Sequence, residues 1–215
     1  MIKAVIFDMD GVITDDKSQD FSAWKRIFSD FGLKLNHDTY LLFLGKKGEE
    51  IIRNYISPNI NKKETVQIVD RKEKYFAKGT EKNKLKPAKG LKELFKKLEK
   101  NNIKIGLGTS APKYKVNIIL NNLGFQKVFS AVVVAEEVKK GKPNPEIYSR
   151  VARKLNLQPK ECIVVEDAPN GVCAAKNAGM KCIAITTTHK ERELKGADKI
   201  ISSFNELTVK ELNKF

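Results

Sequence analysis

The chain has 215 residues, 41% of them hydrophobic and 31% charged, which is typical of a globular protein that buries a sizeable core. Its apolar runs are far shorter than the ~20 residues of a membrane helix, and its N-terminus lacks a signal-peptide pattern, so we expect a cytoplasmic protein without membrane contact. The net charge of +15 comes from an excess of basic residues, and lysines lie at helical spacing among leucines in segments such as 91–104. This pattern is typical of a solvated helix face. It argues against nucleic-acid binding, whereas the positive charge favours attraction of anionic substrates.

The first predicted element is a short buried strand, "KAVIF" (3–7), which is apolar and rich in β-branched residues. Residues 15–83 then contain only segments of helical period, without a strand-like run between them. Helices are predicted there at 18–32, 37–45, 48–56 and 62–79. The polar stretch 80–90 reads as the linker that leads back to the sheet. The sequence therefore predicts an all-helical insertion directly after the first strand.

Strands and helices alternate through the rest of the chain. Further strands are predicted at 103–108, 129–135, 162–166, 181–185 and 199–201, and helices at 91–104, 111–124, 144–157 and 168–180. Such alternation predicts an α/β fold in which helices cover both faces of a Rossmann-like parallel sheet. The three cysteines have no metal-binding spacing and are predicted to be free, buried thiols.

Polar clusters follow four of the predicted strands. Asp8 and Asp10 follow the first strand, "GTSAP" (108–112) follows the second, and "GKPNP" (141–145) and "VEDAPNG" (165–171) follow later ones. In an open parallel sheet, ligands bind beyond the carboxyl ends of the strands. We therefore expect these four clusters to meet at one edge of the sheet.

The residue types in these clusters suit phosphoryl transfer. Four carboxylates that share one pocket repel one another unless a cation is present, and an oxygen-rich site suits Mg²⁺. Lysine and threonine side chains suit phosphate oxygens. A carboxylate beside both can attack phosphorus and form an aspartyl-phosphate, while the cation and the lysine neutralise the charge that opposes the attack.

The ordered motifs "DMDGV", "GTSAP", "KGKPNP" and "VEDAPNG" resemble those of the haloacid dehalogenase-like hydrolase superfamily. With a helical insertion after the first motif, the chain resembles the phosphoglycolate phosphatase and β-phosphoglucomutase branch. The resemblance implies an α/β core domain of residues 1–14 and 84–215 and a helical cap domain of residues 15–83. It also implies Mg²⁺ as cofactor and a small phosphorylated metabolite as substrate. For the oligomeric state we expect a monomer or a weak dimer.

The resemblance implies a catalytic role for four residues. Asp8 matches the nucleophile that becomes phosphorylated, and Asp10 matches the general acid that later acts as the base for water. Thr109 matches a hydroxyl that binds phosphate, and Lys142 matches the lysine that neutralises it.

The resemblance also implies binding residues. Backbone N–H groups of Gly11, Val12 and Ser110 would lie near the phosphoryl group. The metal would be held by the carboxylates of Asp8 and Asp167, by the carbonyl of Asp10, and by Glu166 directly or through water.

Each residue also has a structural alternative. Asp10 directly precedes Gly11, and this pair is a common signal of a surface turn, to which Asp8 could also belong. Helix caps are the alternative for Thr109, Ser110 and Asp167, which stand just before predicted helices. The two histidines, His37 and His189, fall outside the four clusters and are predicted to be surface or cap residues.

The insertion is expected to select the alcohol of the substrate. The related mutases carry an arginine that binds a second phosphate, whereas the matching stretch "LGKKGEE" (44–50) has none, and Asp20 stands where they place a histidine. Lys46 and Lys47 are candidate substrate-binding residues in that loop, although both could be solvated charges. These departures favour a phosphatase over a β-phosphoglucomutase-like mutase. A catalytically silent phosphate- or nucleic-acid-binding module would be expected to lose one of the four main site residues, Asp8, Asp10, Lys142 or Asp167, and all are present.

Overall fold

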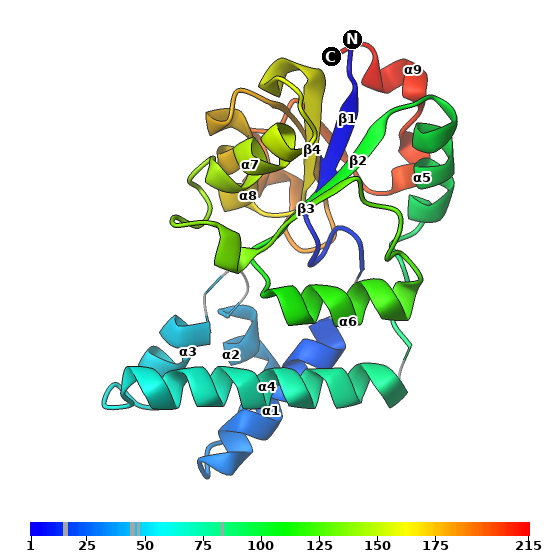
Figure 1. The fold of residues 1–215 in the computed structure, drawn as a ribbon. Coiled ribbons are helices and arrows are strands. Elements are labelled where there is room, and N and C mark those ends of the chain that lie inside the picture. Colours follow the sequence, from blue (N-terminus) through cyan, green and yellow to red (C-terminus); the bar gives the residue numbers. More distant parts are fainter. Residues whose placement is uncertain (15–16, 44–45, 47, 83) are drawn as a thin grey trace. The chain divides into compact units, whose positions relative to one another are not determined.

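The computed structural model describes residues 1–14, 17–43, 46, 48–82 and 84–215. The chain divides into two compact units (Figure 1). Unit 1 consists of Met1–Asp15 and Leu85–Phe215, and unit 2 of Asp16–Lys84. Among the described residues, every helix is too short or too polar to cross a membrane.

Unit 1 is built on a six-stranded sheet in which all neighbouring strands are parallel, in the order β3-β2-β1-β4-β5-β6. The strands are β1 (Ala4–Phe7), β2 (Lys104–Gly108), β3 (Ala131–Val133), β4 (Cys162–Glu166), β5 (Lys181–Ile185) and β6 (Lys199–Ile201). The fully buried β1 lies between β2 and β4, with Phe7 beside Leu107 and Val165. Its central place explains why its residues are continuously apolar.

Helices cover both faces of this sheet (Figure 1). The α-helices of unit 1 are α5 (Leu91–Lys100), α6 (Lys113–Leu123), α7 (Glu146–Lys154), α8 (Pro169–Asn177) and α9 (Val209–Leu212), and its 3₁₀ turns are η1 (Ala135–Glu137), η2 (Pro159–Glu161), η3 (Glu191–Glu193) and η4 (Phe204–Glu206). One face packs on α7 and α8 through Ile6 and Val164, and the other places Phe7 against Phe95 of α5. The predicted α/β fold with a parallel sheet is confirmed.

Unit 2 is all-helical, as predicted for the insertion after β1. It contains α1 (Lys17–Asp30), α2 (His37–Leu41), α3 (Gly48–Tyr55) and α4 (Lys62–Lys82). Its apolar core is aromatic-rich, with Trp24, Phe28, Tyr40 and Phe43 buried together. Packing of such rings against one another stabilises a unit this small beyond the apolar area they bury.

Several boundaries differ from the prediction. Helix α4 runs to Lys82 and so includes the start of the predicted linker, because polar residues there continue the helix without a proline or a capping glycine. Strand β3 has only three residues, Ala131–Val133, because it pairs with β2 alone at the edge of the sheet. Cys173 is exposed on α8, whereas Cys162 and Cys182 are buried as predicted.

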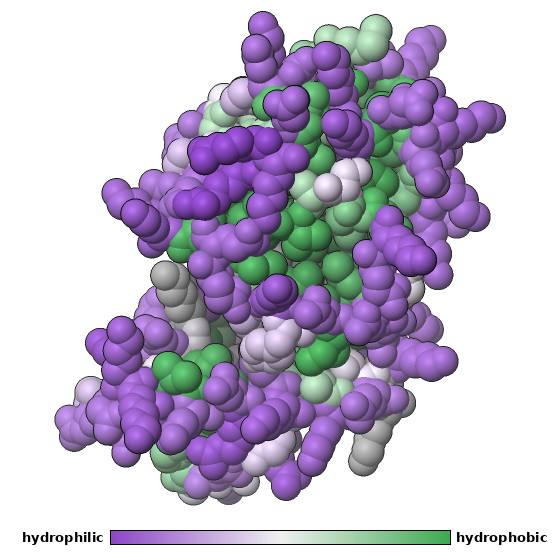
Figure 2. All heavy atoms as spheres, in the orientation of Figure 1, coloured by the Kyte–Doolittle hydropathy of each residue, from purple (hydrophilic) through white to green (hydrophobic). Residues whose placement is uncertain are grey.

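The lysine excess lies mainly on the outside of the protein. Hydrophilic side chains cover most of the face drawn in Figure 2. Two lysines of unit 1 are exceptions, since Lys115 is buried and Lys142 is largely withdrawn from water. Both lie at the carboxyl end of the sheet, where they pair with acidic residues.

Candidate active site

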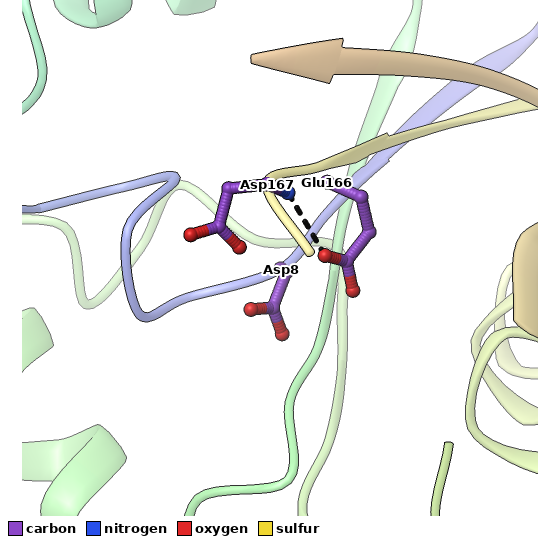
Figure 3. Close-up of side chains that lie close together, drawn as sticks. All are labelled: Asp8, Glu166 and Asp167. Atoms are coloured by element: carbon purple, nitrogen blue, oxygen red, sulfur yellow. Dashed lines mark hydrogen bonds between the residues drawn. The ribbon is translucent and has the colours of Figure 1, made fainter. Parts of the chain in front are cut away.

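Three carboxylates converge where β1 and β4 end (Figure 3). Asp8 follows β1, and its backbone N–H donates to the carbonyl of Val165 at 3.0 Å, which continues the pairing with β4 beyond the last strand residue. Glu166 is the last residue of β4 and Asp167 is the next. Each contributes an oxygen to a group in which all these atoms lie within 4.8 Å of one another, and all three residues are buried.

Lys142 joins two of these carboxylates. Its ammonium lies 2.7 Å from Oδ1 of Asp8 and 2.5 Å from Oε1 of Glu166. The hydroxyl of Tyr148 donates to the same Glu166 oxygen at 2.5 Å, and the ammonium lies 5.1 Å from the centre of the Tyr148 ring. The lysine is therefore fixed beside Asp8 by a charge pair and an aromatic face.

The second oxygen of Glu166 is held by the backbone. Oε2 accepts from the N–H of Asp167 at 2.9 Å and from the N–H of Ala168 at 3.2 Å. Gly171 of α8 leaves the room for this carboxylate, because a Cβ at that position would lie 1.8 Å from Oε1 of Glu166. Gly171 is the last residue of the motif "VEDAPNG", and this role for it was not predicted.

Asp167 is held by a segment that the sequence analysis missed, Thr188 and His189 after β5. The Thr188 hydroxyl donates to the Asp167 carboxylate, and Nδ1 of His189 lies 2.9 Å from the Asp167 carbonyl. His189 is half-buried and so only partly at the surface, where it was predicted, and its contact with Asp167 was not predicted. His37, in contrast, is exposed at the first position of α2, as predicted.

A tight turn brings the chain from Asp8 past Asp167. Gly11 has φ +79°, in the left-handed region, and a Cβ there would lie 2.0 Å from Oδ2 of Asp167. The N–H of Gly11 donates to the carbonyl of Thr14 and that of Val12 to the carbonyl of Met9. Two of the three predicted backbone donors to phosphate, Gly11 and Val12, thus donate within the turn itself. No hydrogen bond joins the N–H groups of Met9 and Asp10 to another described residue, and they remain as alternative donors.

The three acids of the cluster differ in how far neighbouring positive charges and hydrogen bonds offset the cost of burying their negative charge. Burial, together with the neighbouring charges of Glu166 and Asp10, raises the pKa of Asp8 to about 7 despite Lys142. Burial and the charges of Glu166 and Asp8 raise the pKa of Asp167 well above its ordinary value. The pKa of Glu166 is lowered, because its charge pair with Lys142 and three hydrogen bonds outweigh its burial. The cluster therefore contains more negative charge than its one lysine balances.

This imbalance is what a cation site requires. Three buried carboxylate oxygens within 4.8 Å of one another form a hard, oxygen-only donor set, which suits Mg²⁺. The two acids with raised pKa, Asp8 and Asp167, are those that gain most from a cation. The residues present therefore fit the predicted metal.

Asp10 lies apart from this group and is paired with another lysine. Its side chain is 42% exposed, and its Oδ1 accepts from the buried ammonium of Lys115 at 2.9 Å. Lys115 was not predicted, although it interrupts the apolar face that α6 buries, with Val116 and Ile119 beside it. A lysine in such a stripe is a signal that sequence analysis could have used.

The geometry excludes several of the purely structural roles that the sequence left open for these residues. Asp8 is buried, so it is not part of a surface turn. The N-caps of α6 and α8 are Pro112 and Ala168, so neither Ser110 nor Asp167 caps a helix. The buried hydroxyl of Thr109 accepts from the N–H of Ala111 at 3.0 Å, and so stabilises the loop after β2. Ser110 is exposed in the same loop.

The two candidate lysines of the insertion belong to unit 2. Lys46 lies 3.6 Å from the carboxylate of Glu50, and its ammonium lies 5.3 Å from the centre of the Tyr55 ring. These contacts engage Lys46 within its own unit. Lys47 lies outside the described residues. Substrate binding by either residue stays a prediction.

Known proteins resemble this chain over nearly its whole length. A phosphorylated carbohydrates phosphatase of Thermotoga maritima is 33% identical, over 85% of this chain and 84% of its own. A β-phosphoglucomutase of Bacillus subtilis is 32% identical, over 99% and 95%. The crystal structure of a β-phosphoglucomutase from Clostridium difficile superposes with a TM-score of 0.87 at 30% identity, covering 100% of this chain and 96% of that one.

A family model described as haloacid dehalogenase-like hydrolase matches residues 5–185. This range contains all four motifs, from Asp8 to Asp167, and so confirms the resemblance inferred from them. Relatives named as phosphatases support the expected class of phosphoric monoester hydrolases. The buried acids at the ends of β1 and β4 and the match along the chain lead to one conclusion: the chain belongs to the haloacid dehalogenase-like hydrolase family.

Proposed function

We propose that this hydrolase is a Mg²⁺-dependent phosphatase of small phosphorylated metabolites, with Asp8 as the nucleophile. The observation that carries the proposal is the contact of Lys142 with Asp8 inside a buried cluster of three acids. A carboxylate fixed through one oxygen by a lysine, next to a cation site, has what nucleophilic attack on a phosphate dianion requires.

The reaction has two steps. In the first, a carboxylate oxygen of Asp8 forms a bond to phosphorus while the ester P–O bond breaks, and Asp10 gives its proton to the departing alcohol oxygen. In the second, water attacks phosphorus, its proton passes to Asp10, and the bond between phosphorus and Asp8 breaks. Lys142 stays charged throughout: desolvation by burial lowers its pKa, but the charges and hydrogen bonds of Asp8 and Glu166 outweigh this and raise the pKa overall.

Asp8, Glu166 and Asp167 would hold the Mg²⁺ ion, and the carbonyl of Asp10 is a further candidate ligand. When bound, the ion would act as a Lewis acid on the phosphoryl oxygens and offset the negative charge of the cluster. Thr188 and the backbone N–H groups after β4 would keep the ligands oriented.

We assign the choice of substrate to unit 2, as the cap that the family resemblance implies. A sugar phosphate or a phosphoglycolate-type ester is the favoured class, since one relative is named for phosphorylated carbohydrates. Lys46 and Lys47 remain candidate contacts to the substrate.

The experiment is an assay of phosphate release from a panel of glycolate, hexose, pentose and nucleotide phosphates. We expect turnover with Mg²⁺, loss of turnover with excess chelator, and recovery when Mg²⁺ is restored. The variant Asp8→Asn should be inactive towards every ester. Turnover that persists in chelator, or in Asp8→Asn, would contradict the proposal.

A β-phosphoglucomutase-like activity is the second candidate, because relatives of that name match the chain as completely as the phosphatases do. Asp20, which stands where the related mutases place a histidine, pairs here with Lys72. One assay distinguishes the two activities, in which β-glucose 1-phosphate is incubated with a trace of β-glucose 1,6-bisphosphate. A mutase converts it to glucose 6-phosphate, whereas a phosphatase releases inorganic phosphate.

A further inference from the structure

We infer that Lys115 is a positioning residue that fixes Asp10 for proton transfer to the leaving alcohol. The inference rests on the proposed function, because it assigns Asp10 the role of general acid. Its basis is the 2.9 Å contact between the ammonium of Lys115 and Oδ1 of Asp10, within unit 1.

The location of Lys115 is costly for a lysine. The residue is only 6% exposed and lies on the inward face of α6, where Val116 and Ile119 are also buried. A buried ammonium needs a charged or hydrogen-bonded partner to offset the loss of hydration. The Asp10 carboxylate supplies such a partner, so burial of Lys115 and the orientation of Asp10 depend on each other.

Asp10 needs such a restraint more than Asp8 does. The side chain of Asp10 is 42% exposed, against 11% for that of Asp8, so packing alone constrains it less. Among the described residues, Lys115 is the one side chain that hydrogen-bonds the Asp10 carboxylate, and it takes Oδ1. The lysine thereby selects a rotamer in which Oδ2 is left to carry the transferred proton.

The two site lysines thus divide their tasks. Lys142 serves the nucleophile and Glu166, and Lys115 serves the acid. Removal of Lys115 should therefore slow most strongly those steps in which Asp10 moves a proton. Attack by Asp8 on a substrate whose leaving group needs no proton should be nearly unaffected.

The test compares two esters with different leaving groups. Glycerol 3-phosphate releases an alcohol that must be protonated, whereas p-nitrophenyl phosphate releases a stable phenolate. The ratio kcat/KM reports on the steps up to loss of the first product, so it excludes the later attack by water. General acid catalysis contributes about 10²–10⁴-fold, and we expect Lys115→Met to lower kcat/KM for the alkyl ester by about tenfold or more. For the aryl ester we expect a loss of less than about threefold on the same grounds.

A double-mutant comparison tests whether the effect passes through Asp10. In an Asp10→Asn background, Lys115→Met should leave the ratio of the two kcat/KM values unchanged. Lys199→Met is the matched control, because it removes another lysine–carboxylate pair of unit 1, with Glu211, and should leave both esters unaffected. Thermal unfolding of each variant verifies folding.

The outcomes separate this inference from the proposed function. If Lys115→Met slows both esters equally, or changes the ratio further in Asp10→Asn, the positioning role is wrong. If the wild-type chain hydrolyses neither ester, or Asp8→Asn hydrolyses them normally, the proposed function itself fails. An Lys115→Met variant that unfolds is replaced by Lys115→Gln, which keeps a hydrogen-bond donor without the charge and should show a smaller bias of the same sign.

Discussion

Asp167, just after β4, and Asp198, just before β6, lie at opposite ends of the sheet in unit 1. Folding shifts the pKa values of these two carboxyl groups in opposite directions. Asp167 is buried among carboxylates, and this burial and the charges of Glu166 and Asp8 raise its pKa well above the ordinary value. The pKa of Asp198 is lowered to about 2, because hydrogen bonds from Lys176, Lys181 and the N–H of Cys182 outweigh its desolvation.

The contrast separates a site built for a ligand from a contact built for stability. Asp198 ties α8 to the starts of β5 and β6, and each of its oxygens has a donor within the protein. Asp8 and Asp167 at the carboxyl end lack that compensation, as their raised pKa values show, and they need a cation from outside. Residues that are needed for function often reduce the stability of the protein when its ligand is absent. Four substitutions, three at the acidic cluster and one at Asp198, test this difference between the two ends of the sheet.

The largest effect is expected from Asp8→Asn. Loss of the nucleophile should lower kcat by at least about 10³-fold, in line with other catalytic nucleophiles. The amide has the shape of the carboxylate, and Lys142 retains Glu166 as a partner, so the fold should persist. Steady-state kinetics and thermal unfolding check the two halves of this prediction. A stable variant that keeps a tenth of the activity would remove Asp8 from its assigned role.

Asp167→Asn should weaken Mg²⁺ binding by about 10–100-fold or more, since it removes a charged ligand from the cluster. Without metal, the variant should be more stable than the wild-type chain near neutral pH. An acid whose pKa is raised by folding binds more protons in the folded state, so its contribution to stability falls as pH rises above about 4. Calorimetric Mg²⁺ titration and melting temperatures in chelator measure both effects. Unchanged Mg²⁺ affinity would contradict the site.

Gly171→Ala should weaken Mg²⁺ binding and activity several-fold, because the new Cβ would collide with the Glu166 carboxylate. Gly79→Ala in α4 is the matched control, since a Cβ there meets nothing within 4 Å. In an open helical position alanine stabilises by up to about 1 kcal/mol relative to glycine. The control should therefore gain stability while Gly171→Ala loses function. Equal behaviour of the two variants would show that Glu166 tolerates displacement.

The smallest effect is expected from Asp198→Asn, about 1 kcal/mol of stability at neutral pH after allowance for solvent screening. Because folding lowers the pKa of Asp198, its contribution is present above the ordinary value of 3.8 and lost as pH falls towards about 2. Denaturant unfolding at several pH values should show the difference between wild type and variant vanish in acid. Mg²⁺ affinity should not change. A difference that persists at pH 2 would contradict the ionic origin.

Much of unit 1 was predictable from local sequence. The buried run before Asp8 and the alternation of strands with helices determine a parallel sheet, and parallel strands bring their carboxyl ends to one edge. The meeting of Asp8 with Glu166 and Asp167 follows from that topology. Lys142 lies in a loop, so only the family motif distinguished it from the other lysines of the chain.

Residues that support the site from other segments were not predicted. Lys115 lies 105 positions from Asp10, and Thr188 lies 21 positions from Asp167, so no local pattern links the partners. The contact of His189 with Asp167 was not predicted for the same reason, since it depends on how the segment after β5 folds back. The use of the Gly11 and Val12 N–H groups within their turn is likewise a matter of backbone geometry that residue types do not reveal.

Direct detection of a phosphorylated Asp8 tests whether this residue is the nucleophile. The protein is mixed with Mg²⁺ and an excess of an intact ester that it is known from the assay to hydrolyse. The reaction is quenched in acid within milliseconds, and the peptides are analysed by mass spectrometry. Borohydride reduction converts an acyl-phosphate on aspartate to homoserine and so marks the modified residue. We expect a phosphoryl group located at Asp8, at most one per chain, and absent in Asp8→Asn. Turnover without any such group, or a phosphoryl group on another residue, would contradict it.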